Sequence, residues 1–451
     1  MGAMNMVSTP SPGPLAPDGS TRVAIVGAGI AGLSAAWLLR RHARVSVFEA
    51  EARAGGHAET QEVAPDGVPI PVDTGFIVYN TLNYPHLMQF FAALGVATQP
   101  SDMSFGVSVG GGALEYGGGD LRQLFAQHRN ALRPSFWFML RDIMRFYREA
   151  PALAAAPGEE ALGDWLGRSG YGRAFIDHHI LPMGAAIWSG SVQGMRAFPA
   201  RHFARFFQNH GLLRVTDRPQ WRTVSGGSRG YVQRVLETLP GQVRLGQQVD
   251  GIARTGSGVR IHLASGGVEE FDHAILACHA DQALALLHQP TSAEQSVLGA
   301  IPCADNLAVL HDDPSLMPRR RGVWSAWNYL SNGAQDHQAR VSITYWMNRL
   351  QGMQTTRPLL VSLNPLRDPD PSRVFSTRTY RHPQFDAGAM RAQTRLAELQ
   401  GNGGVWFAGA WTGWGFHEDG IASAVRIASA LGVAAPWQHA AAAAPALSRA
   451  A

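Results

Sequence analysis

A glycine pattern near the start of the chain constrains the fold more than any other feature. Residues 23–26 are an apolar, β-branched run suited to a buried parallel strand, and a helix is expected over residues 33–41. Between them stand glycines at G-x-G-x-x-G spacing, which allow a tight turn, close approach of a pyrophosphate and close helix–strand packing. The helix N-terminus would then face the phosphates. The expected dinucleotide contacts are Gly27, Gly29, Ile30, Ala31 and Gly32.

An acidic residue closes the second expected strand. Glu49 follows Gly27 by 22 residues, where a carboxylate can accept hydrogen bonds from a pair of ribose hydroxyls. Glu49 and the adjacent Ala50 are therefore predicted to bind the cofactor. Because strand, helix and acidic residue occur in register, the pattern predicts dinucleotide binding rather than an ordinary glycine turn.

The residues after Glu49 favour FAD over NAD. A second glycine pair follows an arginine, and an apolar strand then ends in another close-approach turn. An NAD domain has no need of these features, whereas an extended FAD can use them along its pyrophosphate and flavin-proximal side. The residues are Arg53, Gly55, Gly56, His57, Asp73, Thr74 and Gly75.

A second cofactor region is expected near the C-terminal end. An apolar strand and Gly409 precede the loop GWGFHEDG, and a helix of small residues is expected to begin at Asp419, Gly420 and Ile421. Its free N–H groups would stabilise the negative charge that a reduced flavin carries near N1 and O2. The alternative is that Glu418 and Asp419 only cap the helix. His417 is the candidate catalytic residue beside the ring, with packing or capping as the alternative role.

The middle of the chain is expected to return to the cofactor domain. Residues 223–239 give a Gly-Gly turn and an amphipathic helix, and residues 242–278 give three short strands. Val249 is expected where backbone groups can pair with the adenine edge.

Length and composition narrow the function classes. The 451 residues exceed the roughly 250 to 300 that one core supports, so two intertwined domains or a domain with a large insertion are expected. All 38 basic residues are arginine, which excludes lysine-assisted chemistry, and their scattering disfavours nucleic-acid binding. Cys278 and Cys303 give no disulfide framework and fit a cytoplasmic protein, and no ligand pattern predicts a metal.

Several segments together resemble the flavin-containing amine oxidase and phytoene desaturase superfamily. They are GAGIAG, EAEARAGG and FAGAW with HEDGIASA. The further segments GGHAET, DTGFIVYN, SDMSFGVS, AAIWSGS, WSAWNYL and TYWMNRLQ resemble the flavin domain found in plant cyclopropane fatty-acid synthases and in stand-alone bacterial proteins. The resemblance runs from about residue 23 to residue 431.

This resemblance implies an α/β fold of the Rossmann type with an inserted α+β substrate domain, non-covalent FAD and a role in membrane-lipid modification. It implies a fatty acyl or phospholipid substrate, a separate lipid methyltransferase as a partner, and contact with the inner face of the membrane. Amine oxidases of the superfamily commonly have a lysine near flavin N5, and none exists here. Amine oxidation is therefore disfavoured.

The expected substrate domain is rich in aromatic residues. Helical stripes at Phe136, Leu140, Ile143 and Tyr147, and at Phe203, Phe206 and Phe207, would be core, an acyl tunnel or a membrane-touching face. The predicted substrate contacts are Tyr79, Trp188, Trp324, Trp327, Tyr345 and Trp346.

These inferences predict an FAD-dependent oxidoreductase that dehydrogenates a methyl-branched or unsaturated acyl group. The alternatives are a redox-neutral fatty acid isomerase and an FAD-containing accessory subunit of a lipid methyltransferase. The expected domain segments are 21–80, 220–280 and 400–433 for FAD, 81–219 and 281–399 for substrate, and flexible ends at 1–20 and 434–451.

Overall fold

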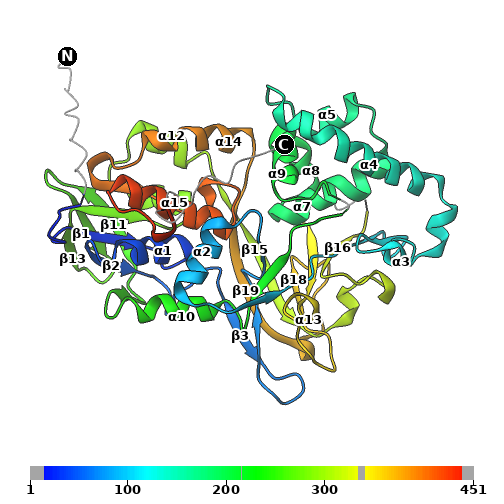
Figure 1. Ribbon diagram of the computed structural model, residues 1–451, viewed down its shortest axis with the longest axis horizontal. Coiled ribbons are helices and arrows are strands. Elements are labelled where there is room, and N and C mark those ends of the chain that lie inside the picture. Colours follow the sequence, from blue (N-terminus) through cyan, green and yellow to red (C-terminus); the bar gives the residue numbers. More distant parts are fainter. Residues whose placement is uncertain (1–14, 215, 334–340, 439–451) are drawn as a thin grey trace, which may run out of the picture.

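The computed structural model describes residues 15–214, 216–333 and 341–438. Figure 1 shows two parts: a parallel sheet with its flanking helices, and a seven-stranded sheet that lies beside a group of helices.

Five parallel strands in the order β10-β2-β1-β14-β20 form the first sheet. Their bounds are β1 Arg22–Val26, β2 Arg44–Phe48, β10 Val243–Arg244, β14 His273–Leu276 and β20 Val405–Phe407. The central strands β1 and β14 are almost wholly buried, as expected for apolar parallel strands covered on both faces. The predicted α/β class with a parallel FAD-binding sheet is confirmed.

Helices from several parts of the chain surround this sheet (Figure 1). They include α1 Ile30–Leu39, α2 Pro85–Leu94, α10 Arg229–Glu237, α11 Ala280–Leu286, α12 Ser292–Leu298, α14 Ala387–Thr394 and α15 His417–Ala430. Helix α1 begins earlier than the predicted 33–41, because Gly29 is already its N-cap, and it ends at Leu39 with Arg40 as the C-cap. Helix α15 begins at His417 rather than Asp419, with Phe416 as the N-cap, and Asp419 accepts a hydrogen bond from the Phe416 N–H at 2.9 Å.

The larger sheet has the order β19-β15-β18-β17-β16-β7-β8. Its strands are β7 Phe105–Val109, β8 Leu114–Gly117, β15 Cys303–His311, β16 Trp327–Ser331, β17 Ser342–Trp346, β18 Leu360–Leu363 and β19 Val374–Pro383. Neighbouring strands are antiparallel except β16 and β7. Two separate stretches of chain thus build one sheet.

Three smaller sheets complete the strand pattern. Their strands are β3 Thr60–Val63 with β4 Ile70–Asp73, β5 Tyr79–Asn80 with β9 Trp221–Val224 and β6 Thr98–Pro100, and β11 Val249–Arg254 with β12 Val259–Leu263 and β13 Val268–Phe271. Residues 242–278 therefore hold five strands rather than the predicted three. The first expected strand is divided between β10 and β11 because Gly246 adopts a positive φ of 66°.

A helical layer lies beside the larger sheet (Figure 1). It comprises α3 Leu121–Leu124, α4 Pro134–Ala155, α5 Leu162–Arg168, α6 Arg173–Phe175, α7 Leu181–Trp188, α8 Val192–Ala197 and α9 Ala200–Asn209, while α13 Met347–Leu350 follows β17. The predicted stripe of Phe203, Phe206 and Phe207 is at most 2% exposed. It is core, so its alternative as a membrane-touching face is wrong.

The ends of the described chain pack on the fold. The Leu15 N–H donates to the Leu431 carbonyl, Ala435 is fully buried, and the Trp437 ring stacks on Trp37 at 6.2 Å. Residues 15–20 and 434–438 thus differ from the expected flexible ends. The rest of those ends, 1–14 and 439–451, lies outside the described residues. Within the described ranges, no helix combines the length and hydropathy needed to cross a bilayer.

Candidate active site

The glycine turn after β1 has the three properties that its spacing predicts. Gly27 has a φ of +102°, which favours glycine. A Cβ on Gly32 would lie 1.9 Å from the Gly27 carbonyl oxygen, so Gly32 sets the close packing of α1 on the turn. A Cβ on Gly29 would meet no atom within 4 Å. The backbone at Gly29 is therefore open to a ligand, next to the N-terminus of α1.

Glu49 hydrogen-bonds to the backbone of this turn and also lines the cavity next to it. One carboxylate oxygen accepts from the Ala28 N–H at 2.7 Å, and the other accepts from the Glu51 N–H at 3.0 Å. A carboxylate that holds two backbone amides is fixed in position. Its contact with a ribose stays a prediction.

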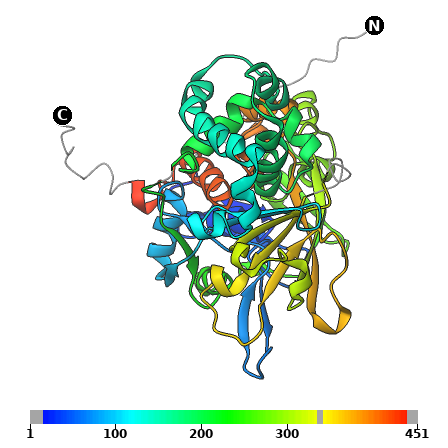
Figure 2. The same cartoon turned by 90° about the vertical axis from the view of Figure 1, so that its right-hand side faces the viewer.

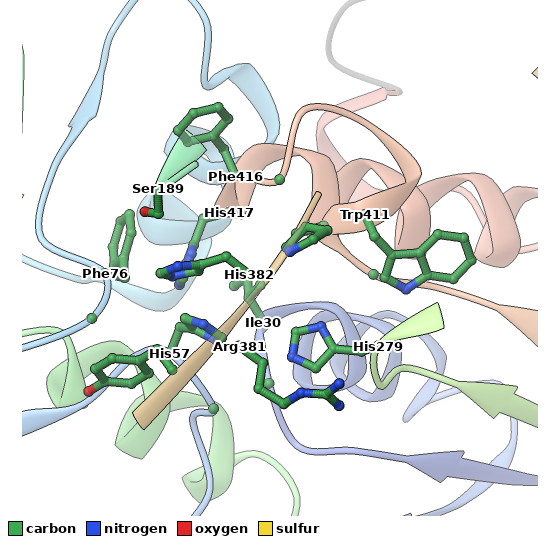
Figure 3. Close-up of a pocket in the computed structure, with 18 of the residues that line it drawn as sticks. Ile30, His57, Phe76, Ser189, His279, Arg381, His382, Trp411, Phe416 and His417 are labelled. Atoms are coloured by element: carbon green, nitrogen blue, oxygen red, sulfur yellow. The ribbon is translucent and has the colours of Figure 1, made fainter. Parts of the chain in front are cut away.

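A cavity of about 710 Å³ extends from this turn into the space between the two parts of the protein. Figure 3 shows labelled residues of its wall that come from α1, β19, α15 and the loop before α15. Of the predicted cofactor residues, the wall includes Gly27, Gly29, Ile30, Ala31, Glu49, Ala50, Gly56, His57, Thr74, Gly75, Val249 and Gly409. Sequence positions more than 350 residues apart thus meet around one space.

The remaining predicted cofactor residues do not line the cavity. They are Gly32, Arg53, Gly55, Asp73, Asp419, Gly420 and Ile421. Arg53 donates to the Glu59 carboxylate at 2.6 Å and to the Gly56 carbonyl at 2.8 Å, so its charge is used within the protein. A Cβ on Gly55 would lie 2.5 Å from the Ala58 carbonyl oxygen.

Asp73 is a buried structural carboxylate. It accepts from the Ser228 N–H and hydroxyl at 2.8 Å, from Thr60 Oγ1 at 2.6 Å and from Gln351 Nε2 at 2.9 Å. Burial raises the pKa of Asp73 to about 6. These bonds tie the β3–β4 hairpin to α10 and α13, which explains why Asp73 lies outside the cavity wall.

The start of α15 serves helix packing and capping. A Cβ on Gly420 would lie 2.8 Å from Ile30 Cγ2, so this glycine lets α15 approach α1 closely, and Ile421 is fully buried. The Glu418 carboxylate accepts from the His86 and Leu87 N–H groups at the start of α2. The alternative role of helix capping is thus right in part: Asp419 caps its own helix, and Glu418 caps a neighbouring one.

His417 lines the cavity in a packed setting. Its ring stacks on Phe76 at 3.7 Å, and its Nε2 lies 3.2 Å from the Tyr231 hydroxyl. Burial lowers the pKa of His417 to about 3, so the imidazole is neutral at physiological pH. The packing role is observed, and the catalytic role stays a prediction.

A group of rings that the sequence patterns do not reveal lies beside His57. His382 and Tyr380 from β19 have ring centroids 5.3 Å and 5.1 Å from that of His57, and the His279 ring centroid is 6.1 Å away. Figure 3 labels His57, His279 and His382. Burial and the neighbouring His279 lower the pKa of His382 to about 4. Burial also lowers the pKa of His57 well below its usual value. The cluster is therefore a neutral, polar part of the wall.

A chain of hydrogen bonds fixes the tautomer of His382. The Leu307 N–H donates to Asn364 Oδ1, and Asn364 Nδ2 donates to Asn306 Oδ1 at 2.7 Å. Asn306 Nδ2 then lies 3.0 Å from His382 Nδ1, which must accept. The neutral ring consequently carries its proton on Nε2. No sequence motif signals this arrangement, because strand pairing between β15 and β19 brings these residues together.

The predicted substrate contacts divide into two groups. Trp188, Trp327 and Tyr345 line the cavity, with Trp327 and Tyr345 packed edge to face at 5.0 Å. Tyr79, Trp324 and Trp346 do not line it, so the cavity gives their assignment no support. Trp324 and Trp346 pack on each other at 5.5 Å, and Tyr79 packs on Phe91 at 5.6 Å.

Charge is sparse on the wall. Among the described residues that line the cavity, Glu49 is the one acidic side chain and Arg381 the one cationic side chain. Arg381 pairs with Asp281 at 2.6 Å. Cys278 also lines the cavity, and burial raises the pKa of its thiol to about 12, so it is not a nucleophile at neutral pH. The described residues contain no group of His, Cys, Asp or Glu side chains suited to a metal ion.

The fold and the glycine turn after β1 define a class of protein, the FAD-dependent oxidoreductases. The sequence model of the family "Flavin containing amine oxidoreductase" matches residues 30–308. The chain belongs to this family, and FAD is its cofactor. The open backbone at Gly29, the start of α1 and the adjoining cavity fit that cofactor.

Solved structures agree on the fold. Cyclohexylamine oxidase from Brevibacterium oxydans has a TM-score of 0.67 and 17% identity, and a putrescine oxidase bound to putrescine has a TM-score of 0.64 and 17% identity. The CLA-producing fatty acid isomerase from P. acnes has a TM-score of 0.61 and 12% identity. Each alignment covers 91% of this chain and 98% of the other. The comparison with curated proteins gave no match.

Proposed function

We propose that the protein oxidises an apolar fatty acyl chain and dehydrogenates a methyl-branched or unsaturated acyl group of a membrane lipid. The observation that carries this proposal is the charge of the cavity wall, on which Glu49 is the sole described carboxylate. Glu49 is held by two backbone amides at the dinucleotide end. A buried ammonium group needs a counter-charge, whereas an acyl chain needs none.

The wall beyond the dinucleotide end suits such a chain. Helix α7 contributes aliphatic side chains, α9 contributes an aromatic ring, and β16, β17 and β18 contribute aromatic and aliphatic side chains. They include Met183, Ala186, Ile187, Phe206, Trp327, Tyr345, Val361 and Leu363. Apolar walls of this kind are typical of sites for apolar ligands. They also exclude water from the reacting carbons.

The residues of this chain have separable roles in the proposed reaction. Gly27, Gly29 and Glu49 would hold the cofactor, and bound FAD supplies the two-electron acceptor for hydrogen removed from carbon. His382 carries its N–H on Nε2 because Asn306 donates to its Nδ1, and His417 stays neutral. Dehydrogenation breaks one C–H bond on each of two neighbouring carbons and forms a C=C bond, with one hydrogen leaving as hydride and the other as a proton.

A second candidate is a redox-neutral fatty acid isomerase. It is supported by the shared fold with a fatty acid isomerase and by the same uncharged wall. The resemblance to flavin domains of cyclopropane fatty-acid synthases supports a lipid substrate in both cases. It also suggests a separate lipid methyltransferase as a partner, with this chain as an FAD-containing accessory subunit as a third candidate.

Mass spectrometry of the lipid product tests the proposal. Purified holoprotein would be incubated with defined phospholipids that carry mid-chain methyl-branched or monounsaturated acyl groups. The fatty acids would then be hydrolysed from the phospholipids and their masses measured. Loss of two hydrogens supports dehydrogenation. An unchanged mass with a moved double bond supports the isomerase instead, and unchanged fatty acids contradict both enzymes and leave the accessory subunit.

A further inference from the structure

Exposed apolar side chains gather on one segment of the helical layer. Within residues 121–144, five large apolar side chains are 46% to 85% exposed: Leu121, Leu132, Trp137, Phe138 and Met144. We call this surface the α3–α4 face. Scattered exposed apolar residues are ordinary, but so many within one short segment favour an interaction site.

The two sides of α4 explain how this face arises. Phe136, Met139 and Phe146 are at most 2% exposed and form the inner side, which packs toward α9. Trp137 and Met144 project from the opposite side. Of the predicted stripe, Phe136 is buried on this inner side, whereas Leu140, Ile143 and Tyr147 are only partly buried against the same core. The exposed apolar residues occupy positions outside the stripe.

Arginines occur along the same stretch of chain as the exposed apolar residues, and the Arg141 guanidinium lies over the Phe138 ring at 5.2 Å. The basic residues within 120–149 are Arg122, Arg129, Arg133, Arg141, Arg145 and Arg148. The acidic ones are fewer and engaged: Asp120 caps α3, the buried Asp142 pairs with Arg141 at 3.0 Å, and Glu149 pairs with Arg145 at 2.8 Å. The face thus combines apolar groups with a net positive charge.

The α3–α4 face lies one helix away from the cavity. Helix α4 packs on α9, and Phe206 and His210, at the end of α9, line the cavity. In Figure 2 the cyan and teal helices of this segment lie on the side turned to the viewer.

We propose that the α3–α4 face docks the protein on the surface of an anionic phospholipid bilayer. The apolar side chains would enter the boundary between headgroups and acyl chains, while the arginines would meet lipid phosphates. A second copy of the chain fits less well, because two such faces would bring arginines of like charge together. This inference goes beyond the proposed reaction and does not depend on it, since binding is measured without turnover.

Vesicle co-sedimentation of the FAD-loaded protein tests the docking. The vesicles are phosphatidylcholine alone or phosphatidylcholine with phosphatidylglycerol. Wild type is expected to bind the anionic vesicles at least tenfold more tightly, and added salt should weaken binding. Leu132→Asp/Phe138→Asp should weaken it at least tenfold, whereas Val68→Asp, at a site 65% exposed in the β3–β4 turn, should not.

Charge reversal gives a second, milder test. Each basic residue near an anionic surface contributes about 1 kcal/mol, so Arg122→Glu should weaken binding at least fivefold. Arg234→Glu on α10 makes the same change of charge elsewhere and should have little effect. Circular dichroism and the flavin content of each variant check that the fold is intact.

Equal binding of wild type to both kinds of vesicle would overturn the proposal, and so would full binding by Leu132→Asp/Phe138→Asp. A third contrary result would be a wild-type protein that binds no vesicles but forms a dimer, which Leu132→Asp/Phe138→Asp converts to monomer. The last would assign the face to a second copy of the chain.

Discussion

Asn306 Nδ2 lies 3.0 Å from His382 Nδ1, and this contact determines which nitrogen of His382 carries the proton. The amide is itself oriented by Asn364 and by the Ala304 carbonyl, to which Asn306 Nδ2 also donates. If His382 Nδ1 were protonated, its N–H would point at the N–H group of Asn306 Nδ2, and neither could accept. Together with burial, this holds the ring neutral.

Replacing the amide with a carboxylate should reverse this preference. In Asn306→Asp the side chain accepts a hydrogen bond, so the pKa of His382 should rise from about 4 by at least one unit. Titration by NMR measures the change, and His311 on the same sheet, bonded to Ser362, is the internal control. An unchanged His382 titration would contradict the assigned tautomer.

Closing the open backbone at Gly29 should prevent cofactor binding. Gly29→Trp places an indole where a Cβ meets no atom within 4 Å and where the cavity begins. We expect protein that is folded but purified without flavin absorbance. Gly167→Trp on α5, where a Cβ also meets nothing, should keep its flavin. A fully flavin-loaded Gly29→Trp protein would show that the cofactor lies elsewhere.

The pKa of His417 makes stability depend on pH. Burial lowers its folded pKa to about 3 from 6.5, so its contribution to stability is complete above pH 6.5 and is lost as pH falls toward 3. His417→Phe keeps a ring beside Phe76 without a titrating group. Between pH 4 and 6 the unfolding free energy of both proteins should rise with pH. The slope for the variant should be smaller than the wild-type slope by about 1.4 kcal/mol per pH unit. Urea titrations at several pH values measure both slopes, and equal slopes would contradict the buried neutral histidine.

Two adjacent residues of β17 should separate substrate binding from stability. Tyr345 lines the cavity, whereas Trp346 packs on Trp324 away from it. Tyr345→Ala should raise KM for the acyl substrate several-fold. Trp346→Ala should leave KM unchanged but lower the free energy of unfolding by about 3 kcal/mol. If KM rises only in Trp346→Ala, the assignment of the cavity wall is wrong.

The cofactor end of this fold was predictable because its signal is local. Gly27, Gly29 and Gly32 stand at fixed spacing, and the observed turn shows why each is glycine: a positive φ, an open backbone and close packing. Glu49 follows from the same pattern, since it ends the strand next to β1. Helix starts were less accurate: the first turn of α15 depends on Phe416 and Asp419 pairing across it.

The substrate side was harder to predict because its signal is not local. Alternation along β16 and β17 shows that neighbouring side chains face opposite ways, but not which face meets the cavity. Of the two predicted contacts on β17, Tyr345 therefore lines the cavity and Trp346 does not. His382 and Asn306 are 76 residues apart and meet through antiparallel pairing, which no short motif records.

Anaerobic flavin absorbance tests the central claim most directly. The purified holoprotein would be mixed, without oxygen, with phospholipids carrying mid-chain methyl-branched or unsaturated acyl groups, and in parallel with cyclohexylamine and putrescine. We predict that the lipids bleach the oxidised flavin absorbance and that the amines leave it unchanged, because the cavity wall beyond Glu49 offers no described carboxylate to an ammonium group. Bleaching by the amines and none by the lipids would contradict this account.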